Sequence, residues 1–287
     1  MAKVFPAILP LFIILEFSHL AEACFGFYAN SVTNFHPRQD LPDLCTTGKR
    51  QAPIDIDTTR CEDGEFKSDL KWFFHSGPLM MVNTGARVDV TYTRTDVRPY
   101  VTGGPLCDNY IHLNTHFHWG ETDAKGSDHS IDGVFGPFEM HFNYIKKEYG
   151  TLDEARRHKD GLAIVAVMFE LSSTDNADLE GILEGVGNVQ GAPGDTFMLQ
   201  DGALDFALKK GFSEQCFYNY HGSLTSNQCP EVVNWIVMKK PLTISSAQVA
   251  EFRNLVGSDG KPILSFRREI QPTNGRQILC SGCLCGR

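Results

Sequence analysis

Two histidines one residue apart, His116 and His118, are the residues best placed to do chemistry in this chain of 287 residues. In an extended strand, side chains alternate between the two faces, so residues i and i+2 point the same way. Both imidazoles can therefore aim at one point, and a third histidine, His141, follows in another strand-like run, residues 138–142. Three neutral imidazoles leave a tetrahedral zinc ion one open position, where a bound water ionises near neutral pH. The pattern therefore predicts a catalytic metal site rather than a structural one.

The surroundings of these histidines decide the interpretation, because a lone His-x-His pair in a strand is more often incidental than metal-binding. In the second run, Glu139 and Asn143 share a face with His141. A ligating imidazole usually donates its second N–H to a carboxylate or a carbonyl oxygen, so Glu139 is a suitable partner for His141. Asn114, two residues before His116, can serve that ligand in the same way.

Four blocks of sequence, taken in order, resemble the α-type carbonic anhydrases, as found in a secreted member of the family. They are residues 114–120, 126–133, 139–141 and 222–225, and similarity in residues 48–56, 160–165 and 271–276 extends the resemblance from about residue 25 to about residue 279. The resemblance implies zinc as the cofactor, bound by His116, His118 and His141, with Asn114 and Glu139 behind the ligands. It implies reversible hydration of carbon dioxide to bicarbonate and a proton as the activity.

The resemblance also assigns catalytic roles. Thr225 matches the threonine that orients the attacking oxygen, and its own proton would go to Asp128, where the family normally has glutamate. The shorter side chain requires a shift of the backbone or lengthens that hydrogen bond, and as an alternative Asp128 is simply a turn residue. Ala86 occupies the position of the histidine that carries the proton to solvent. Alanine cannot carry a proton, so we expect an active but slow enzyme.

The apolar wall that holds carbon dioxide in the family is matched by Ile164, Leu224, Val233 and Trp235. Asn143 replaces a usual valine of that wall, which would narrow or wet the pocket.

Other candidates are weaker. His112 lies four residues before His116, but the segment alternates as a strand and lacks the glutamate of a helical zinc-protease motif. His129 resembles a buried, hydrogen-bonded histidine of the family. Ser223 has no nucleophile elbow around it, so serine hydrolase chemistry is poorly supported.

A binding or extracellular-matrix protein that has kept the fold and lost the chemistry is the alternative function. Such relatives typically lose a zinc ligand, whereas all three histidines remain here. That favours the enzyme, while the changes at Ala86, Asp128 and Asn143 keep the alternative open.

The first 23 residues have the order of a secretory signal peptide: Lys3, an apolar run over residues 4–15, and small residues ending at Ala23. We therefore expect a secreted, extracellular protein. The run is shorter than the roughly 20 apolar residues of a membrane span, and no later segment qualifies. The formal net charge of −9 makes nucleic acid an unsuitable partner, and the expected substrate is a small molecule, carbon dioxide or bicarbonate.

All nine cysteines follow the predicted cleavage site, in a compartment where disulfides persist. The resemblance implies a bridge between Cys45 and Cys229. An odd count leaves at least one cysteine without a partner in the chain, so a disulfide-linked oligomer is a hypothesis. The cysteine-rich tail, residues 280–287, binds metal or forms disulfides, of which disulfides are the commoner outcome after a signal peptide.

The chain between these termini, residues 24–279, is expected to be one domain of strand-dominated α+β class. Strands are predicted at residues 87–92, 111–119, 138–144, 162–169 and 232–237, and helices at residues 153–158 and 246–254. The resemblance implies a large twisted, mainly antiparallel sheet of about ten strands, with short peripheral helices.

Overall fold

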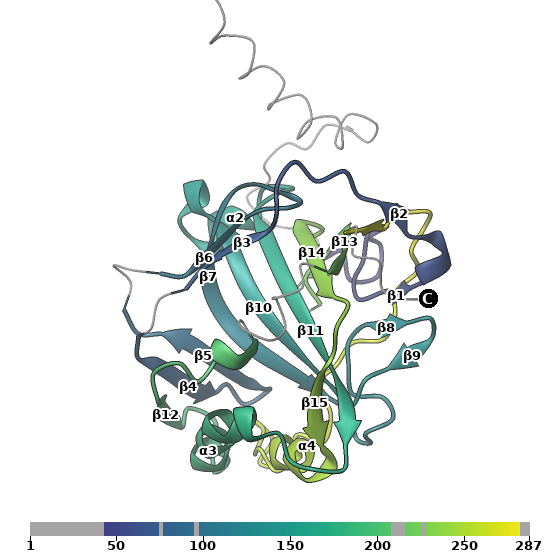
Figure 1. Ribbon diagram of the computed structural model, residues 1–287. Helices are drawn as coiled ribbons and strands as arrows, with labels where there is room; N and C mark the ends of the chain where they lie inside the picture. Colours follow the sequence, from purple (N-terminus) through teal and green to yellow (C-terminus); the bar gives the residue numbers. More distant parts are fainter. Residues whose placement is uncertain (1–42, 75–76, 95–97, 208–215, 226–227, 282–287) are drawn as a thin grey trace, which may run out of the picture. The chain divides into compact units, whose positions relative to one another are not determined.

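A computed structural model describes residues 43–74, 77–94, 98–207, 216–225 and 228–281. The predicted signal peptide and the tail beyond residue 281 lie outside these residues. Within them, the protein is built on one sheet of thirteen strands, with few and short helices (Figure 1). The predicted fold class is confirmed.

Ten strands of the sheet follow one another without a break. In spatial order they are β12 (Thr196–Leu199), β4 (Leu79–Asn83), β5 (Val88–Tyr92), β7 (Leu106–Trp119), β10 (Phe138–Lys146), β11 (Leu162–Ser172), β14 (Val233–Met238), β13 (Phe217–Gly222), β16 (Leu279–Cys280) and β2 (Glu62–Asp63). Three more are attached to this path: β3 (Lys71–Phe73), β6 (Tyr100–Gly103) and β15 (Leu242–Ser245). Neighbours are antiparallel except where β11 meets β14 and β15 and where β16 meets β2. A separate small sheet contains β1 (Asp55–Ile56), β8 (Ser130–Ile131) and β9 (Val134–Phe135).

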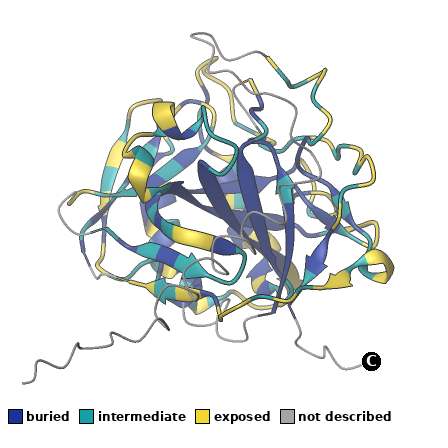
Figure 2. Ribbon diagram, turned by 90° about the horizontal axis from the view of Figure 1, so that it is seen from above, coloured by how far each residue is buried: buried dark blue, intermediate teal, exposed yellow. Residues whose placement is uncertain are grey.

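The two faces of the central strands belong to two apolar clusters. Phe117 of β7 and Met140 and Phe142 of β10 join a cluster that also contains side chains of the helices. On β11, Val165 belongs to that cluster, whereas its neighbour Ile164 belongs to the cluster on the opposite face. Both faces are covered, so β10 and β11 are buried along most of their length (Figure 2). Each large apolar side chain buried in this way contributes roughly 1.5–3 kcal/mol.

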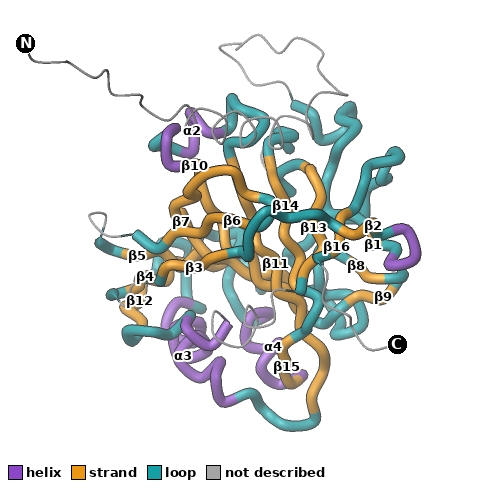
Figure 3. Tube along the Cα trace, turned by 45° about the horizontal axis from the view of Figure 1, so that its top comes forward, coloured by secondary structure: helices purple, strands orange, loops and turns teal. Residues whose placement is uncertain are grey.

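The helices lie at the periphery of the sheet (Figure 3). The predicted helix at residues 246–254 is confirmed as α4 (Ser246–Arg253), which starts at a capping box between Ser245 and Gln248. The predicted helix at residues 153–158 is wrong in extent, because α2 (Leu152–Ala155) is a single turn after the capping residue Thr151.

A third helix, α3 (Glu180–Val189), was not predicted from the sequence. Three glycines lower its intrinsic helix propensity. One of them, Gly185, faces Leu199 and Met81 so closely that a β-carbon would collide with Leu199. The glycine that weakens the sequence signal is therefore what lets the helix approach the sheet.

Disulfides join segments that are distant in the sequence. The structure contains the Cys45–Cys229 bridge that the resemblance implies, and a second bridge, Cys61–Cys280. Cys280, assigned from sequence to the tail, thus lies in β16. Cys107 and Cys216 are also disulfide-bonded, so every cysteine in the described segments is paired. A cysteine without an intrachain partner must then be one of the remaining three, Cys24, Cys283 and Cys285.

In the segments that the structure describes, no helix has the length and apolar character that crossing a membrane requires.

The buried His112 of β7 predicts a specific loss of stability in acid. Its side chain is 4% exposed, and burial, with a smaller contribution from Arg98, lowers its pKa to about 3. In the unfolded chain the pKa is about 6.5. Between these values the unfolded chain binds a proton that the folded chain does not, so the free energy of unfolding decreases as the pH is lowered, by about 1.4 kcal/mol per pH unit at the steepest. We expect H112Q to unfold in urea with a shallower pH dependence over this window.

His158, whose side chain is 37% exposed, is changed to glutamine in parallel and controls for the loss of an imidazole as such. Equal flattening in H112Q and H158Q would contradict this prediction.

Candidate metal centre

The pairing of β7 with β10 brings the three predicted ligands together. In the antiparallel register, His141 lies opposite His116 and Glu139 lies opposite His118. The histidines alternate along their strands with the residues that face the helices, so all three project from the other face. They are 7%, 2% and 0% exposed, in the order of the chain.

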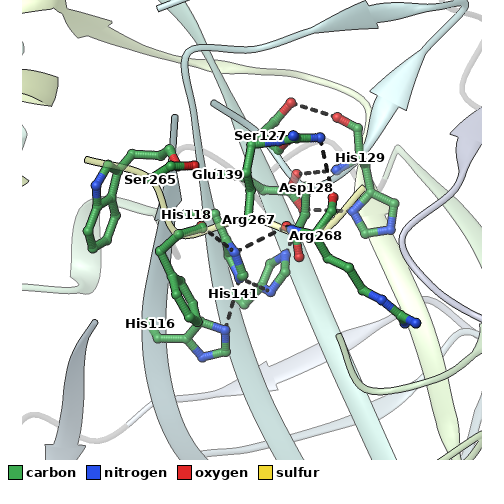
Figure 4. A network of polar contacts seen from close by, with 12 residues as sticks. His116, His118, Ser127, Asp128, His129, Glu139, His141, Ser265, Arg267 and Arg268 are labelled. Carbon is green, nitrogen blue, oxygen red and sulfur yellow. Dashed lines mark hydrogen bonds and ion pairs between the residues drawn. The ribbon is translucent and has the colours of Figure 1, made fainter. Parts of the chain in front are cut away.

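The three rings converge through one nitrogen each. His118 Nε2 lies 3.0 Å from His116 Nε2 and 2.9 Å from His141 Nδ1 (Figure 4). Zinc–nitrogen bonds of about 2.0–2.1 Å in a tetrahedron separate the ligand atoms by about 3.3 Å. A few tenths of an ångström of expansion would therefore accommodate the ion, and the three histidines form a group that could hold a metal.

The remaining nitrogens of two rings face acceptors. His141 Nε2 donates to Glu139 Oε1 at 2.6 Å. His118 Nδ1 lies 3.1 Å from the carbonyl oxygen of Phe266 and 3.2 Å from Asp128 Oδ1, both acceptors. These contacts place the protons on the outer nitrogens and leave the lone pairs pointing at the centre, as metal binding requires.

Glu139 is the anchor of a buried network on this side of the sheet. It accepts from the backbone N–H of His129 at 2.8 Å and from His129 Nδ1 at 2.7 Å, and His129 Nε2 lies 2.7 Å from the hydroxyl of Tyr220. Burial raises the pKa of Glu139, but the neighbouring His129 and His141 outweigh it and hold that pKa well below its usual range. His129 is thus buried and hydrogen-bonded, as the resemblance implies.

Two of the ligand candidates, His116 and His141, are held neutral. Burial, followed by the electrostatic effects of Arg87 and of the other two histidines, lowers the pKa of His116 well below its usual value. Burial and His118 lower the pKa of His141 to about 4, against the opposing effect of Glu139. Neutral imidazole is the form that binds a metal ion.

His116 has a different partner from the one expected. Asn114 does not contact it, because Asn114 Nδ2 donates to Asp89 Oδ2 at 3.0 Å. Instead Asn143 Nδ2 lies 2.8 Å from His116 Nδ1 and donates to Asn114 Oδ1 at 2.7 Å. Asp89 is in turn bound by Arg87 through two contacts of 2.5 and 3.2 Å. The sequence reasoning missed Arg87 and Asp89, whose i, i+2 spacing at the start of β5 was the available signal.

This polar chain presents an amide donor to His116. The Asp89 carboxylate requires a donor from Asn114, which leaves Asn114 Oδ1 as an acceptor and fixes Asn143 Nδ2 as a donor. The donor favours a lone pair on His116 Nδ1 and a proton on His116 Nε2, the nitrogen that faces the other two ligands. Asn143 Oδ1 is buried and has no hydrogen-bond partner in the described structure.

Asp128 faces the C-terminal part of the chain. Its Oδ1 accepts from the backbone N–H of Arg268 at 2.8 Å. Its Oδ2 is buried and lacks a hydrogen-bond partner among the described residues, so no hydrogen bond from Thr225 reaches it here. Burial raises the pKa of Asp128, but the contact with His118 outweighs this effect and holds the pKa below its usual value.

A cavity of about 70 Å³ opens beside His116. Of the predicted pocket and catalytic residues, Asn143, Ile164, Leu224 and Thr225 line it, together with Asn114. Val233 and Trp235 do not line it; both are buried, and the Trp235 ring packs edge-on against His141 at 5.0 Å. The other lining residues, not anticipated from sequence, are Arg87, Leu113, Tyr144, Leu152, Arg156 and Leu162.

Comparison with known proteins agrees with this geometry. A family model described as eukaryotic-type carbonic anhydrase matches residues 36–282. The chain is also 33% identical to mouse "Carbonic anhydrase 6" over 244 residues, which cover 80% of this chain and 73% of that protein.

Replacement of Asn143 by valine tests the effect of the amide donor on the metal centre. N143V removes the hydrogen bond that favours the proton on His116 Nε2. One such bond is worth about 1 kcal/mol, so we expect zinc to bind roughly 5-fold more tightly, measured by chelator competition. I164V, on the same cavity wall but without a polar contact to a ligand, is the matched control. Weaker zinc binding by N143V would mean that Asn143 supports the ligand as an acceptor, contrary to this prediction.

Proposed function

Because the chain belongs to the eukaryotic-type carbonic anhydrase family, we propose that it catalyses the reversible hydration of carbon dioxide to bicarbonate and a proton at a zinc ion held by His116, His118 and His141. The observation that carries this proposal is the convergence of three buried imidazoles beside a cavity. Bound there, zinc supplies a strong nucleophile from water at neutral pH.

The protein's own groups orient the reactants. Thr225 lines the cavity with His116, and its hydroxyl would accept a hydrogen bond from the attacking oxygen and direct the oxygen's lone pair at carbon dioxide. Its proton would be accepted by Asp128, whose buried Oδ2 has no other partner among the described residues. Glu139 holds the ring of His141 in the tautomer that presents Nδ1 to the metal.

The carbon dioxide subsite would be formed by Ile164 and Leu224, which give the cavity an apolar wall. Val233 and Trp235 would support that wall from behind, since both are buried without lining the cavity. Asn143 adds an amide to a surface that must hold an apolar molecule, which weakens the binding of carbon dioxide.

Proton export is the weak step of the proposed cycle. Ala86 is exposed on the turn between β4 and β5 and offers no acid or base. Among the described residues that line the cavity, His116 is the only histidine, and it is a proposed ligand. The proton would therefore leave through buffer molecules, and turnover would depend on buffer concentration.

The protein would act outside the cell. Six of its nine cysteines are in disulfides, which persist in oxidising compartments, and residues 1–23 have the pattern of a secretory signal. A disulfide-linked oligomer would use one of the three cysteines outside the described segments.

A binding or extracellular-matrix role with little catalysis is the second candidate. The unpartnered Asp128 Oδ2 favours it, because a threonine without an acceptor for its proton is poorly held for catalysis. Zinc would then serve as a stabilising ion. Activity of the zinc-loaded protein separates the two functions.

The decisive variant is H116A. We expect it to lose zinc and to lower carbon dioxide hydration in stopped-flow assays to the uncatalysed background, because two imidazoles leave the ion weakly held. H158A, the same substitution at a partly exposed histidine that does not line the cavity, should retain both properties. Zinc-loaded wild-type protein without any rate above background would establish the binding role instead. Catalysis by a folded, zinc-free H116A would refute the proposed site.

The missing proton carrier can be restored. We expect A86H to raise turnover in weak buffer by about 10-fold or more, because a positioned acid or base typically contributes 10²–10⁴-fold to the step it serves. The variant should also depend less on added imidazole than wild type. A124H, which places a histidine on an exposed loop that does not line the cavity, is the control. Wild-type turnover that is already independent of imidazole would contradict the argument.

A further inference from the structure

We propose that Arg156 forms a binding subsite for small trigonal oxyanions, such as bicarbonate or acetate, in the cavity beside the metal centre. Arg156 follows α2 and lines the same cavity as His116 and Thr225. This proposal deepens the proposed function and rests on it only for the identity of bicarbonate as the natural anion.

The guanidinium of Arg156 is incompletely satisfied. Its Nε is buried and has no hydrogen-bond partner in the described structure. Its ion pair is a 3.8 Å contact from Nη1 to Asp153, whose side chain is 91% exposed. A pair of that length to a solvated carboxylate contributes little, so the buried edge of the cation lacks an acceptor. A buried donor without a partner carries a desolvation cost that a bound anion would remove.

The second arginine of the cavity, Arg87, has its charge matched by a carboxylate. Arg87 makes two hydrogen bonds to Asp89 and lies over the ring of Phe266 at 5.4 Å. Its charge is therefore matched within the protein. The contrast assigns the anion to Arg156, since of the two arginines only that one has a buried N–H group without a hydrogen-bond partner in the described structure.

The cavity suits a small anion. Its volume of about 70 Å³ exceeds the 10–15 Å³ that one water needs and admits a molecule of a few heavy atoms. Leu113, Leu152 and Leu162 form much of the lining, which lowers the local dielectric and strengthens the attraction of a cation for an anion. The planar guanidinium matches two oxygens of a trigonal oxyanion better than a point charge does.

In a carbonic anhydrase, this subsite would bind bicarbonate, which is the product of hydration and the substrate of dehydration. Bicarbonate that leaves the metal centre through this cavity would meet Arg156, which lines it. The enzyme would bind bicarbonate at lower concentration in the dehydration direction, and accumulated bicarbonate would inhibit hydration more strongly. The tighter binding and the stronger inhibition both depend on the dissociation constant of bicarbonate at Arg156.

Acetate binding to the purified mature protein measures the subsite without catalysis. We would titrate [¹³C]acetate and follow its NMR line width with wild type, R156Q, R156K and R157Q. Loss of a charged hydrogen-bond donor should weaken acetate binding by about 10-fold or more in R156Q. R156K keeps the charge without the planar fork and should fall between wild type and R156Q. R157Q removes the same charge one residue away, outside the cavity lining, and should match wild type.

The inhibition constant of bicarbonate in carbon dioxide hydration is the second measurement, and it should rise in R156Q by the same factor as the acetate constant. Acetate affinity that is unchanged in R156Q, or that falls equally in R156Q and R157Q, would overturn the subsite. A wild-type protein without hydration activity but with Arg156-dependent acetate binding would overturn the proposed function and leave the subsite standing.

Discussion

The antiparallel register of β7 and β10 is the constraint on which the metal centre depends. It sets His141 opposite His116 and Glu139 opposite His118, so ligands from distant parts of the sequence share one face. A slip of one residue would turn one strand's ligands toward the helices and bring Phe117 or Met140 into the polar face. The apolar cluster that holds Phe117, Met140 and Phe142 against the helices therefore fixes the metal centre as well as the fold. The burial of apolar side chains on one face of the sheet therefore keeps the metal ligands in position on the other face.

Burying a polar centre in this way requires that its charges be matched within the protein. Glu139 is fully buried, yet it is ionised because His129 and His141 donate to it. The backbone carbonyl of Phe266 accepts from His118, which ties the C-terminal segment to the centre. Arg268 extends that connection, because its guanidinium donates to the backbone carbonyls of Ala52 and Cys45. The bridge between Cys45 and Cys229 then links this N-terminal segment to the loop after Thr225. Segments from both ends of the domain are thus required to complete the surroundings of the ligands.

The sequence predicts the parts of the structure that depend on local periodicity. The i, i+2 spacing of His116 and His118 and the alternation around His141 placed the ligands on strands, and both strands are observed. Contacts between side chains of different strands were less predictable. Asn114 and Asn143 are both near His116, but which of them reaches the ring depends on Asp89 of a third strand, which draws Asn114 away. The bridge from Cys61 to Cys280 depends on the pairing of β16 with β2, which no local pattern reveals. The same holds for Arg156, whose place in the cavity follows from the packing of a single helical turn.

The departures from the family pattern fall outside the group that binds the metal, and the architecture explains why. His116, His118 and His141 lie on central strands whose neighbours are buried, so a change there would disturb the core. Ala86 lies on an exposed turn, where substitutions cost little stability. Asn143 and Asp128 are the exceptions, because both are buried. Asn143 is on β10 itself, and Asn114 and His116 satisfy its amide nitrogen. One oxygen of Asp128 accepts from the backbone of Arg268. The central strands therefore fix the position of the metal. Proton export and anion affinity depend instead on residues outside those strands, Ala86 and Arg156. Selection can change the rate and the preferred anion of such an enzyme without altering the site that performs the chemistry.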